Sequence, residues 1–393
     1  MSDTLYNSCD IDILVNNKST NIPLKNIKLY IRDSIFDKYS QCKLIINDKD
    51  FLLSEYFAFV NGTNIGVKFD INNDCWKQTN YVVFANSLVQ QNTQSSMGGD
   101  LELECLHEYA YKQKLTQEIY DNYNISDIVE NAISDYKFNS TNIDATNNKG
   151  YWINPNKKPM NFIDENLLPY SFYNNNYNSP YYCFIDTNNN FNFKTLFVLK
   201  NQNPIAEYTY GNLNNCKNQI LKVSILQTSV DKIINNYNVI YDSFDENGIF
   251  TKGENKFINE YPNNESKLSY KSNLDLLTKE NLYCLEPDLI DNDYEKTQNG
   301  YEINNIKQSI YCDKLVITIP LNRKACAGKL IKINLPISIN NTNDNVSQRY
   351  SGTYLIESSV HSWNGTTANT TLTISKQNIN VDSTYSYKND LVK

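Results

Sequence analysis

Gly352-Thr353-Tyr354-Leu355-Ile356-Glu357-Ser358-Ser359-Val360-His361 is a long strand-forming run near the end of the chain, and it continues to Trp363. A second strand-forming run, Thr370-Thr371-Leu372-Thr373-Ile374-Ser375, follows a few residues later. Asn364-Gly365 separates the two runs, and this dipeptide is a strong signal for a tight hairpin turn. The end of the chain is therefore predicted to form an antiparallel β-hairpin.

Strand-forming sequence also precedes this hairpin and fills the first hundred residues. Upstream of the hairpin, apolar residues alternate over 315–319, and Leu330–Leu335 forms a further run. The first module is predicted from these alternating sets: Ile27, Leu29 and Ile31; Leu44 and Ile46; Phe57 and Phe59; Ile65, Val67, Phe69 and Ile71; Tyr81, Val83 and Ala85; Leu101, Leu103, Cys105 and His107. Short runs with Asn, Asp and Gly between them favour an antiparallel sandwich or small barrel. Met97-Gly98-Gly99-Asp100 is predicted as the turn between the last two strands.

The middle of the chain has a different period. Apolar residues between Ile125 and Tyr136 recur at spacings of 3 and 1, which predicts one amphipathic helix, and a short second helix is predicted over 161–168. The stretch 139–158 between them is predicted as a polar loop. The remaining predictions are an Asn- and Tyr-rich loop from Ser171, a hairpin with its turn at Asp186–Asn190, a strand at Leu221–Ile225, and a loop-rich 253–298 with a short helix at 274–277. The chain is thus predicted as β, then α/β, then β.

Composition excludes several classes of function. Roughly 16% of the residues are Asn, 30 are Tyr, and only Arg32, Arg323 and Arg349 are arginines, a pattern typical of an A/T-rich coding sequence. A formal net charge of −8 with so few arginines disfavours electrostatic binding to nucleic acid. The sequence contains no long apolar run that would span a membrane and no basic, apolar leader at its start. The nine cysteines are scattered and predicted to be reduced core residues.

Recognised catalytic and cofactor motifs are missing from the sequence. His107-Glu108 begins like a metalloprotease HExxH motif, but Tyr111 stands where its second histidine would be. There is no CxxC pair, phosphate-binding glycine loop or GxSxG elbow. We therefore expect no catalytic, cofactor-binding or metal-binding residue.

Three regions together resemble one protein family. The first is Leu29-Tyr30-Ile31-Arg32-Asp33-Ser34-Ile35-Phe36, and the second is Gly99-Asp100-Leu101-Glu102-Leu103-Glu104-Cys105-Leu106-His107 with the helix at 126–133 behind it. The third comprises Ala327-Gly328-Lys329-Leu330-Ile331-Lys332-Ile333 and the closing hairpin. In order and spacing these regions are similar to the central baseplate hub of T-even-like contractile-tailed phages, whose relatives form the base of type VI secretion spikes.

The resemblance implies a β-rich α+β fold with two similar antiparallel β-barrel domains and a mixed α/β middle domain. The domains would be 1–112 (first barrel), 113–205 with about 240–310 (middle), about 206–239 with 311–378 (second barrel), and a tail at 379–393. The family-motif residues, with structural roles, would be Arg32, Asp33, Ser34, Gly99, Leu101, Leu103, Gly328, Gly352, Tyr354, Ile356, Val360 and His361.

The resemblance also implies a function. The chain would be a homotrimeric symmetry adaptor without catalysis, since three chains with two barrels each present six similar modules to a hexameric tail tube. Its partners would be the tail tube, the trimeric central spike, baseplate wedge proteins, and DNA passing without specific binding. It would be made in the bacterial host cytoplasm and act in the virion.

Two other classes of function remain open. One is another β-rich virion component, such as a tube, adaptor or receptor-binding module, in which the Tyr- and Asn-rich segment recognises a glycan or partner. The other is a cell-wall-degrading enzyme of the tail tip, which would need paired carboxylates in one cleft. The strand pattern alone does not separate these alternatives from the hub.

Overall fold

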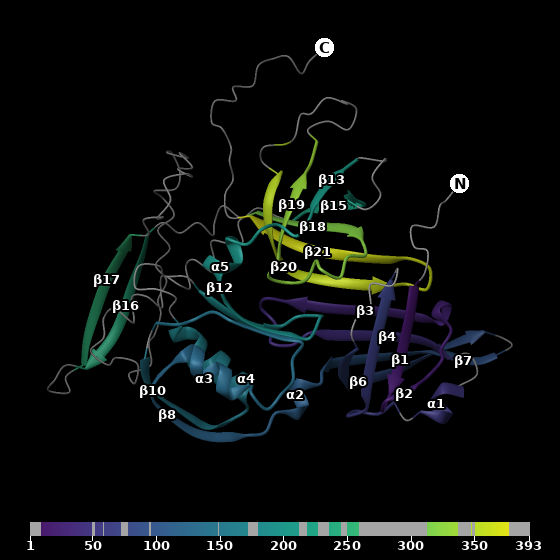
Figure 1. Cartoon of the computed structure of the whole chain (residues 1–393), viewed down its shortest axis with the longest axis horizontal. Coiled ribbons are helices and arrows are strands. Elements are labelled where there is room, and N and C mark those ends of the chain that lie inside the picture. Colours follow the sequence, from purple (N-terminus) through teal and green to yellow (C-terminus); the bar gives the residue numbers. More distant parts are fainter. Residues whose placement is uncertain are drawn as a thin grey trace, which may run out of the picture.

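The computed structural model describes residues 9–48, 52–57, 59–71, 78–93, 96–147, 149–171, 180–211, 218–226, 236–244, 250–258, 313–336, 347 and 350–376. The helix predicted at 274–277, most of the Asn- and Tyr-rich loop and the tail at 379–393 lie outside these residues. Figure 1 shows strands from the two ends of the chain stacked against each other, with the middle of the chain to one side.

Strands from both ends join in one sheet of fourteen strands. The first part of the chain supplies β1 (Cys9–Val15), β2 (Lys18–Ser19), β3 (Ile27–Ser34), β4 (Gln41–Asp48), β5 (Asn64–Ile71), β6 (Thr79–Thr93) and β7 (Ser96–His107). The later part supplies β13 (Glu207–Tyr210), β14 (Gln219–Ile220), β15 (Lys222–Ile225), β18 (Asp313–Pro320), β19 (Leu330–Asn334), β20 (Gly352–Trp363) and β21 (Ala368–Lys376). The main path runs β14-β13-β19-β20-β3-β4-β7-β6-β5-β1-β2, and β21 and β18 continue from β20 to β15.

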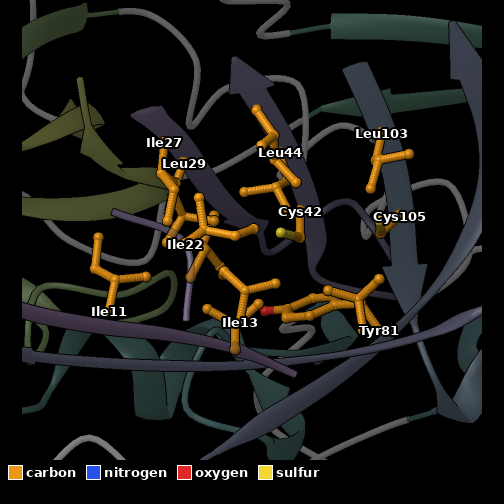
Figure 2. Packing of buried hydrophobic residues seen from close by; sticks show 14 of the residues in the cluster. Ile11, Ile13, Ile22, Ile27, Leu29, Cys42, Leu44, Tyr81, Leu103 and Cys105 are labelled. Carbon is orange, nitrogen blue, oxygen red and sulfur yellow. The ribbon is translucent and has the colours of Figure 1, made fainter. Parts of the chain in front are cut away.

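The N-terminal strands enclose one hydrophobic core. Alternate residues of β3 are buried at Ile27, Leu29 and Ile31, and Leu29 lies opposite Leu44 of β4. Period-2 alternation places every second side chain on one face of a strand, so these residues line the interior together. Figure 2 shows Ile27, Leu29 and Leu44 in the same interior as Ile13 and other apolar side chains of this cluster. The alternation predicted for these strands is therefore confirmed.

The C-terminal strands enclose a second, separate core. Leu315, Ile317 and Ile319 of β18 are buried against Leu372 and Ile374 of β21. The predicted hairpin at the end of the chain is present, since β20 and β21 pair antiparallel from Trp363↔Ala368 onward. Gly365 in its turn has a φ of +96°, a conformation that glycine adopts without a steric penalty.

β20 is the strand that links the two cores. Its first half pairs with β19, from Leu330↔Leu355 to Ile333↔Gly352, whereas its second half pairs with β3, from Ser358↔Ser34 to Trp363↔Leu29. A register shift at Glu357 marks the change of partner. The carbonyl of Glu357 accepts a hydrogen bond from the N–H of Ile35 at 2.9 Å, and its nearly buried carboxylate lies 2.7 Å from Lys314 Nζ. An extra residue of this kind, a β-bulge, bends the strand and changes its direction.

The middle of the chain has its own core, between small sheets and short helices. Its elements are α2 (Tyr109–Lys112), β8 (Thr116–Asn124), α3 (Ile125–Ala132), β9 (Ser140–Ile143), β10 (Lys149–Lys157), α4 (Pro159–Phe162), a π-helical turn η2 (Ile163–Leu167), a 3-10 turn η3 (Leu168–Tyr170), β11 (Tyr181–Ile185), β12 (Asn190–Thr195) and α5 (Leu196–Lys200). β8 pairs only with β10 among the described strands, and β11-β12-β9 form a three-stranded sheet. Both predicted helices and the predicted hairpin are confirmed.

Three shorter elements complete the description. η1 (Leu24–Asn26) and α1 (Leu52–Tyr56) flank N-terminal strands, and β16 (Asn236–Phe244) pairs with β17 (Phe250–Ile258) as a separate ribbon (Figure 1). Among the helices that the structure describes, none is long and apolar enough to cross a membrane.

Several local predictions were wrong. Met97 and Gly98 lie within β7, paired with Asn92 and Gln91 of β6, so the chain reverses between Thr93 and Ser96 rather than at 97–100. Phe57 follows the helical turn α1 and donates its N–H to the carbonyl of Leu53 at 2.8 Å, so it does not begin a strand. The supposed loop 139–158 contains β9 and β10. In β10, Tyr151 and Ile153 on the exposed face are apolar whereas Asn154 on the inner face is polar, so the polar–apolar alternation that indicates a strand is missing.

The β-rich class is confirmed, with a large and mainly antiparallel sheet and few helices. The predicted short strand near Leu221–Ile225 is also present as β15, which pairs with β18. Only a few pairings in the large sheet, those of β13 with β14 and β19, are parallel.

Candidate functional site at the strand junction

Most of the predicted motif residues lie near the point where β3 and β20 meet. Arg32, Asp33 and Ser34 end β3. On β20, Val360 lies opposite Arg32 and His361 lies opposite Ile31, while Ile356 precedes the register shift. Gly328 lies in the loop between β18 and β19 and donates its N–H to the carbonyl of Ile356 at 2.8 Å. Gly99, Leu101 and Leu103 lie elsewhere, in β7, where all three are buried in the N-terminal part of the sheet.

Asp33 joins three separate parts of the chain. Its Oδ2 accepts a hydrogen bond from the N–H of Thr187 at 2.9 Å. Its Oδ1 accepts one from the N–H of Ala327 at 3.1 Å and one from the hydroxyl of Ser359 at 2.6 Å. The side chain is almost fully buried, so each of these donors depends on it for a partner.

The turn between β11 and β12 docks into this junction. Asp186 shapes the turn, since its Oδ1 accepts the N–H groups of Asn188 and Asn190, both at 2.9 Å, and its Oδ2 accepts the Asn190 side-chain amide at 2.9 Å. Within the turn, the Asn189 amide oxygen lies 3.0 Å from Nε2 of His107, the last residue of β7. The side-chain amide of Asn188 donates to the carbonyl of Arg323 at 3.2 Å. The turn thus contacts the end of β7 and the loop that follows β18.

Two buried carboxylates therefore lie near each other. Burial, followed by the charge of Asp186, raises the pKa of Asp33 to about 6, although the hydrogen bonds from Ser359, Thr187 and Ala327 oppose this shift. Burial also raises the pKa of Asp186, against the hydrogen bonds from its own turn. The Cys326 thiol, 3.8 Å from Asp186 Oδ2, has its pKa raised well above the usual range by burial and by both carboxylates. A raised pKa of this kind favours the protonated thiol over the nucleophilic thiolate.

Both histidines of the chain are buried and neutral near pH 7. His361 Nδ1 lies 3.0 Å from the hydroxyl of Thr370, and its Nε2 lies 3.4 Å from that of Ser359. Burial lowers the pKa of His361 to about 3 and that of His107 to about 4. The predicted strand-end position of His107 is confirmed, and its ring packs edge-on against Tyr81.

Gly328 is where the loop before β19 approaches the middle of the chain most closely. Its φ is +80°, and a Cβ at this position would lie 2.8 Å from Cζ of Phe184. Phe184 belongs to a small hydrophobic cluster with residues from the N-terminal part, the middle and the C-terminal part of the chain. Its members are Ile35, Tyr182, Phe184, Leu196, Leu199, Ala327, Leu330 and Leu355. A glycine here satisfies both the backbone conformation and the close contact.

The remaining motif residues have ordinary structural environments. Arg32 is exposed and forms a 3.2 Å ion pair with Asp37, and the Ser34 hydroxyl accepts the N–H of Phe36 at 3.2 Å. Tyr354 is buried and donates its hydroxyl to the carbonyl of Tyr350 at 2.9 Å. Val360 is half-buried and pairs with Arg32, while Gly352 has a φ of +126° close to Lys376.

The sequence interpretation missed four of the residues that build this junction: Asp186, Cys326, Glu357 and Ser359. Asp186 lay in a predicted turn, but nothing in the sequence showed that the turn docks against Asp33. Within the described residues, no group of three or more His, Cys, Asp or Glu side chains is placed to hold a metal ion. The arrangement therefore fixes the geometry of three regions with buried hydrogen bonds.

Comparison with solved structures shows that two tail proteins share this fold. No protein-family model matches the sequence, and no curated protein matches it significantly. Among solved structures, a tail protein from Neisseria meningitidis MC58 is similar, with a TM-score of 0.56 and 9% identity, over 95% of this chain and 98% of that one. A 43 kDa tail protein of prophage MuSo2 from Shewanella oneidensis has a TM-score of 0.59 at 10% identity, over 94% and 97% of the two chains.

A chain of a Francisella PdpA–VgrG complex is similar as well, with a TM-score of 0.51 and 11% identity over 95% of this chain and 59% of that chain. Identities this low show a shared fold. The match extends over nearly the full length of both tail proteins. The resemblance inferred from the three sequence regions is confirmed as a resemblance of fold.

Proposed function

We propose that this chain is the central hub of a contractile-tail baseplate, a structural protein without catalytic activity. The observation that carries the proposal is the similarity of fold over 94–95% of this chain to two tail proteins, one of them from a prophage. The similarity to a VgrG-containing complex supports the same family of injection machines. The hub would act in the virion after synthesis in the host cytoplasm.

The arrangement of cores supports a role as a symmetry adaptor. The chain contains two strand modules, each with its own hydrophobic cluster, and β20 connects them directly to each other. We propose that each module is a β-barrel domain and that the chain forms a homotrimer. Three copies then present six similar modules to a hexameric tail tube, while the trimer axis matches a trimeric central spike.

The proposed domains follow the sequence interpretation. The first barrel comprises 1–112, the middle domain 113–205 with about 240–310, and the second barrel about 206–239 with 311–378, followed by a tail at 379–393. Of the motif residues, Asp33 and Gly328 then act by holding these domains together. An adaptor has to keep its two modules in fixed relative positions, and the buried junction around Asp33 supplies that rigidity.

The net charge of the chain is compatible with a channel role. A protein with a formal charge of −8 does not attract DNA non-specifically, and DNA can pass such a hub without binding. We assign the tail tube, the central spike and the wedge proteins as its protein partners.

Light scattering of the purified chain at micromolar concentration tests this proposal. We expect one species with three times the chain mass of 45.5 kDa. Co-expression with the tube and spike proteins encoded nearby should then give a complex that contains all three. A clean monomer that joins neither protein would overturn the proposal, and peptidoglycan clearing by the purified chain would favour the tail-tip enzyme instead.

A further inference from the structure

Cys42 of β4 and Cys105 of β7 lie directly opposite each other among the N-terminal strands. β4 and β7 are antiparallel neighbours, and Cys42↔Cys105 is one of their register pairs (Figure 2). The same row continues to Ile31 of β3 and Val83 of β6, and all four side chains are buried in one core. Directly opposite residues of paired strands point to the same face of the sheet. Two thiols therefore face each other inside an apolar interior.

The backbone spacing at this pair fits a disulfide. The N–H of His107 donates to the carbonyl of Ser40 at 3.0 Å, so these opposite residues form a hydrogen-bonded pair. Such pairs recur at every second position of an antiparallel ladder, which makes Cys42↔Cys105 another of them, with Cα atoms about 5.5 Å apart. Disulfides join Cα atoms that are usually about 4.4–6.8 Å apart. An approach of about 1 Å between the two Cβ atoms is then enough to form the bond.

Cys42 and Cys105 differ in this respect from Cys183 and Cys326, which are buried thiols of the same described part of the chain. Cys183 lies opposite Phe193, and the Cys326 thiol lies beside a carboxylate in the loop before β19. All four thiols are free in the structure. Burial raises the pKa of Cys105 to about 12 and that of Cys42 well above its ordinary value. Because thiolate is scarce at neutral pH, the facing pair stays reduced until an oxidant reaches it.

We propose that Cys42 and Cys105 are a redox pair, which hydrogen peroxide converts to a cross-strand disulfide. One thiolate attacks an oxygen of the peroxide, which breaks the O–O bond and leaves a sulfenic acid on that cysteine. The second sulfur then displaces the hydroxyl group of the sulfenic acid, so an S–S bond forms. In sum, both thiols lose their hydrogen atoms, and the peroxide is reduced to two molecules of water. A peroxide is small, which suits a pair that is reached only through local opening of the strands.

The disulfide links two strands that are neighbours in the sheet but distant in the chain. β5 and β6 lie between β4 and β7 in the sequence, so the bond closes a covalent loop that contains both of them. A cross-link of this kind restricts the unfolded chain and thereby stabilises the folded one. The N-terminal strands are then more resistant to unfolding in oxidising surroundings than in reducing ones. The inference depends on this pair alone and does not rest on the proposed hub function.

Peptide mapping of the full-length chain tests the pairing. The chain is purified with reductant, freed of it, treated with hydrogen peroxide, unfolded in N-ethylmaleimide to block the remaining thiols, and digested without reductant. We expect the peptides that contain Cys42 and Cys105 to be joined, with the loss of two hydrogen atoms, and to separate after dithiothreitol. Labelling of both residues by N-ethylmaleimide, or their conversion to sulfinic acids without a link, would overturn the proposal.

Urea unfolding tests the consequence of the bond. The oxidised wild-type chain should unfold at a higher urea concentration than the reduced chain. Cys183→Ala is the matched control, since it also removes one buried thiol, and it should keep this difference, whereas Cys42→Ala should lose it. Circular dichroism of the reduced variants checks that both fold. A rise of the same size in Cys42→Ala would assign the stabilisation to other thiols and contradict the inference, as would an oxidised wild-type chain with an unchanged midpoint.

Discussion

Asp33 and Ser359 are 326 positions apart, and a 2.6 Å hydrogen bond from the Ser359 hydroxyl to the Asp33 carboxylate joins the first strand module to the last long strand. The same carboxylate accepts N–H groups from the middle hairpin turn and from the loop before β19. One short acidic side chain thus connects the N-terminal strands, the middle of the chain and the C-terminal strands.

Replacement of Asp33 by Ala should lower the free energy of unfolding by about 3 kcal/mol or more. Three buried donors would lose their acceptor, and each unsatisfied group costs about 1–3 kcal/mol. Urea unfolding at a fixed protein concentration measures the effect. Asp37→Ala, which removes only an exposed ion pair with Arg32, is the control and should change the free energy by less than about 1 kcal/mol. Equal effects of the two substitutions would show that the buried hydrogen bonds of Asp33 add no more stability than the exposed ion pair of Asp37.

Gly328→Ala should destabilise the chain more than Gly211→Ala. Both glycines have a positive φ, +80° and +85°, so both substitutions carry a conformational cost of about 1 kcal/mol. At Gly328 the new methyl group would also lie 2.8 Å from Phe184, whereas at Gly211 no atom lies within 4 Å. Overpacking adds about 1–3 kcal/mol. The difference between the two unfolding midpoints is the measurement, and Phe184→Leu should recover part of the loss in the Gly328 variant.

Glu357→Ala should cost more stability than Glu207→Ala. The Glu357 carboxylate is 3% exposed and pairs with Lys314 at 2.7 Å, whereas Glu207 and its partner Lys332 are about half exposed at 3.1 Å. Loss of one partner from a buried pair costs about 3–5 kcal/mol, and the partial exposure of Lys314 reduces this to about 2 kcal/mol. The exposed pair should contribute less than about 1 kcal/mol. Similar melting temperatures for the two variants would show that the Glu357–Lys314 ion pair, at the register shift of β20, contributes no more stability than an exposed ion pair.

Stability should fall as the pH is lowered from 6.5 toward 4. The pKa of His361 is lowered to about 3 and that of His107 to about 4, below an ordinary value of 6.5. A lowered folded-state pKa stabilises the fold above pH 6.5, and this stabilisation is lost progressively as the pH falls. Asp33 acts in the opposite direction, because its pKa is raised to about 6 and its protonation favours the folded state at low pH. The two histidine shifts are together larger than the shift of Asp33, and the raised pKa of Asp186 acts in the same direction as that of Asp33.

Urea midpoints between pH 7.5 and pH 4.5 measure this dependence. His361→Gln removes one of the two buried imidazoles and should flatten the profile, since about 1.4 kcal/mol accompanies each unit of pKa difference. Asp33→Asn should make the profile steeper, because it removes the opposing contribution. An unchanged slope in the His361 variant would show that this imidazole does not titrate during acid unfolding.

Much of the fold was predictable from local sequence. The alternation of Ile27, Leu29 and Ile31 and the Asn364-Gly365 turn specify strands and a hairpin through contacts between near neighbours. The role of Asp33 was not predictable, because its partners at Thr187, Ala327 and Ser359 lie far away in the sequence. β10 also escaped prediction, since its exposed face carries apolar residues and thereby blurs the polar–apolar alternation.

The pairing of β3 with β20 has a consequence for synthesis of the protein. Translation proceeds at roughly 5–20 residues per second, so the 326 positions between Asp33 and Ser359 take tens of seconds to emerge. During that time the first module lacks the strand that covers one edge of β3, and its backbone donors and acceptors stay available to other chains. A nascent chain therefore cannot complete its first module before its last long strand leaves the ribosome. Products truncated before β20 would carry an open edge at β3 and be prone to aggregation.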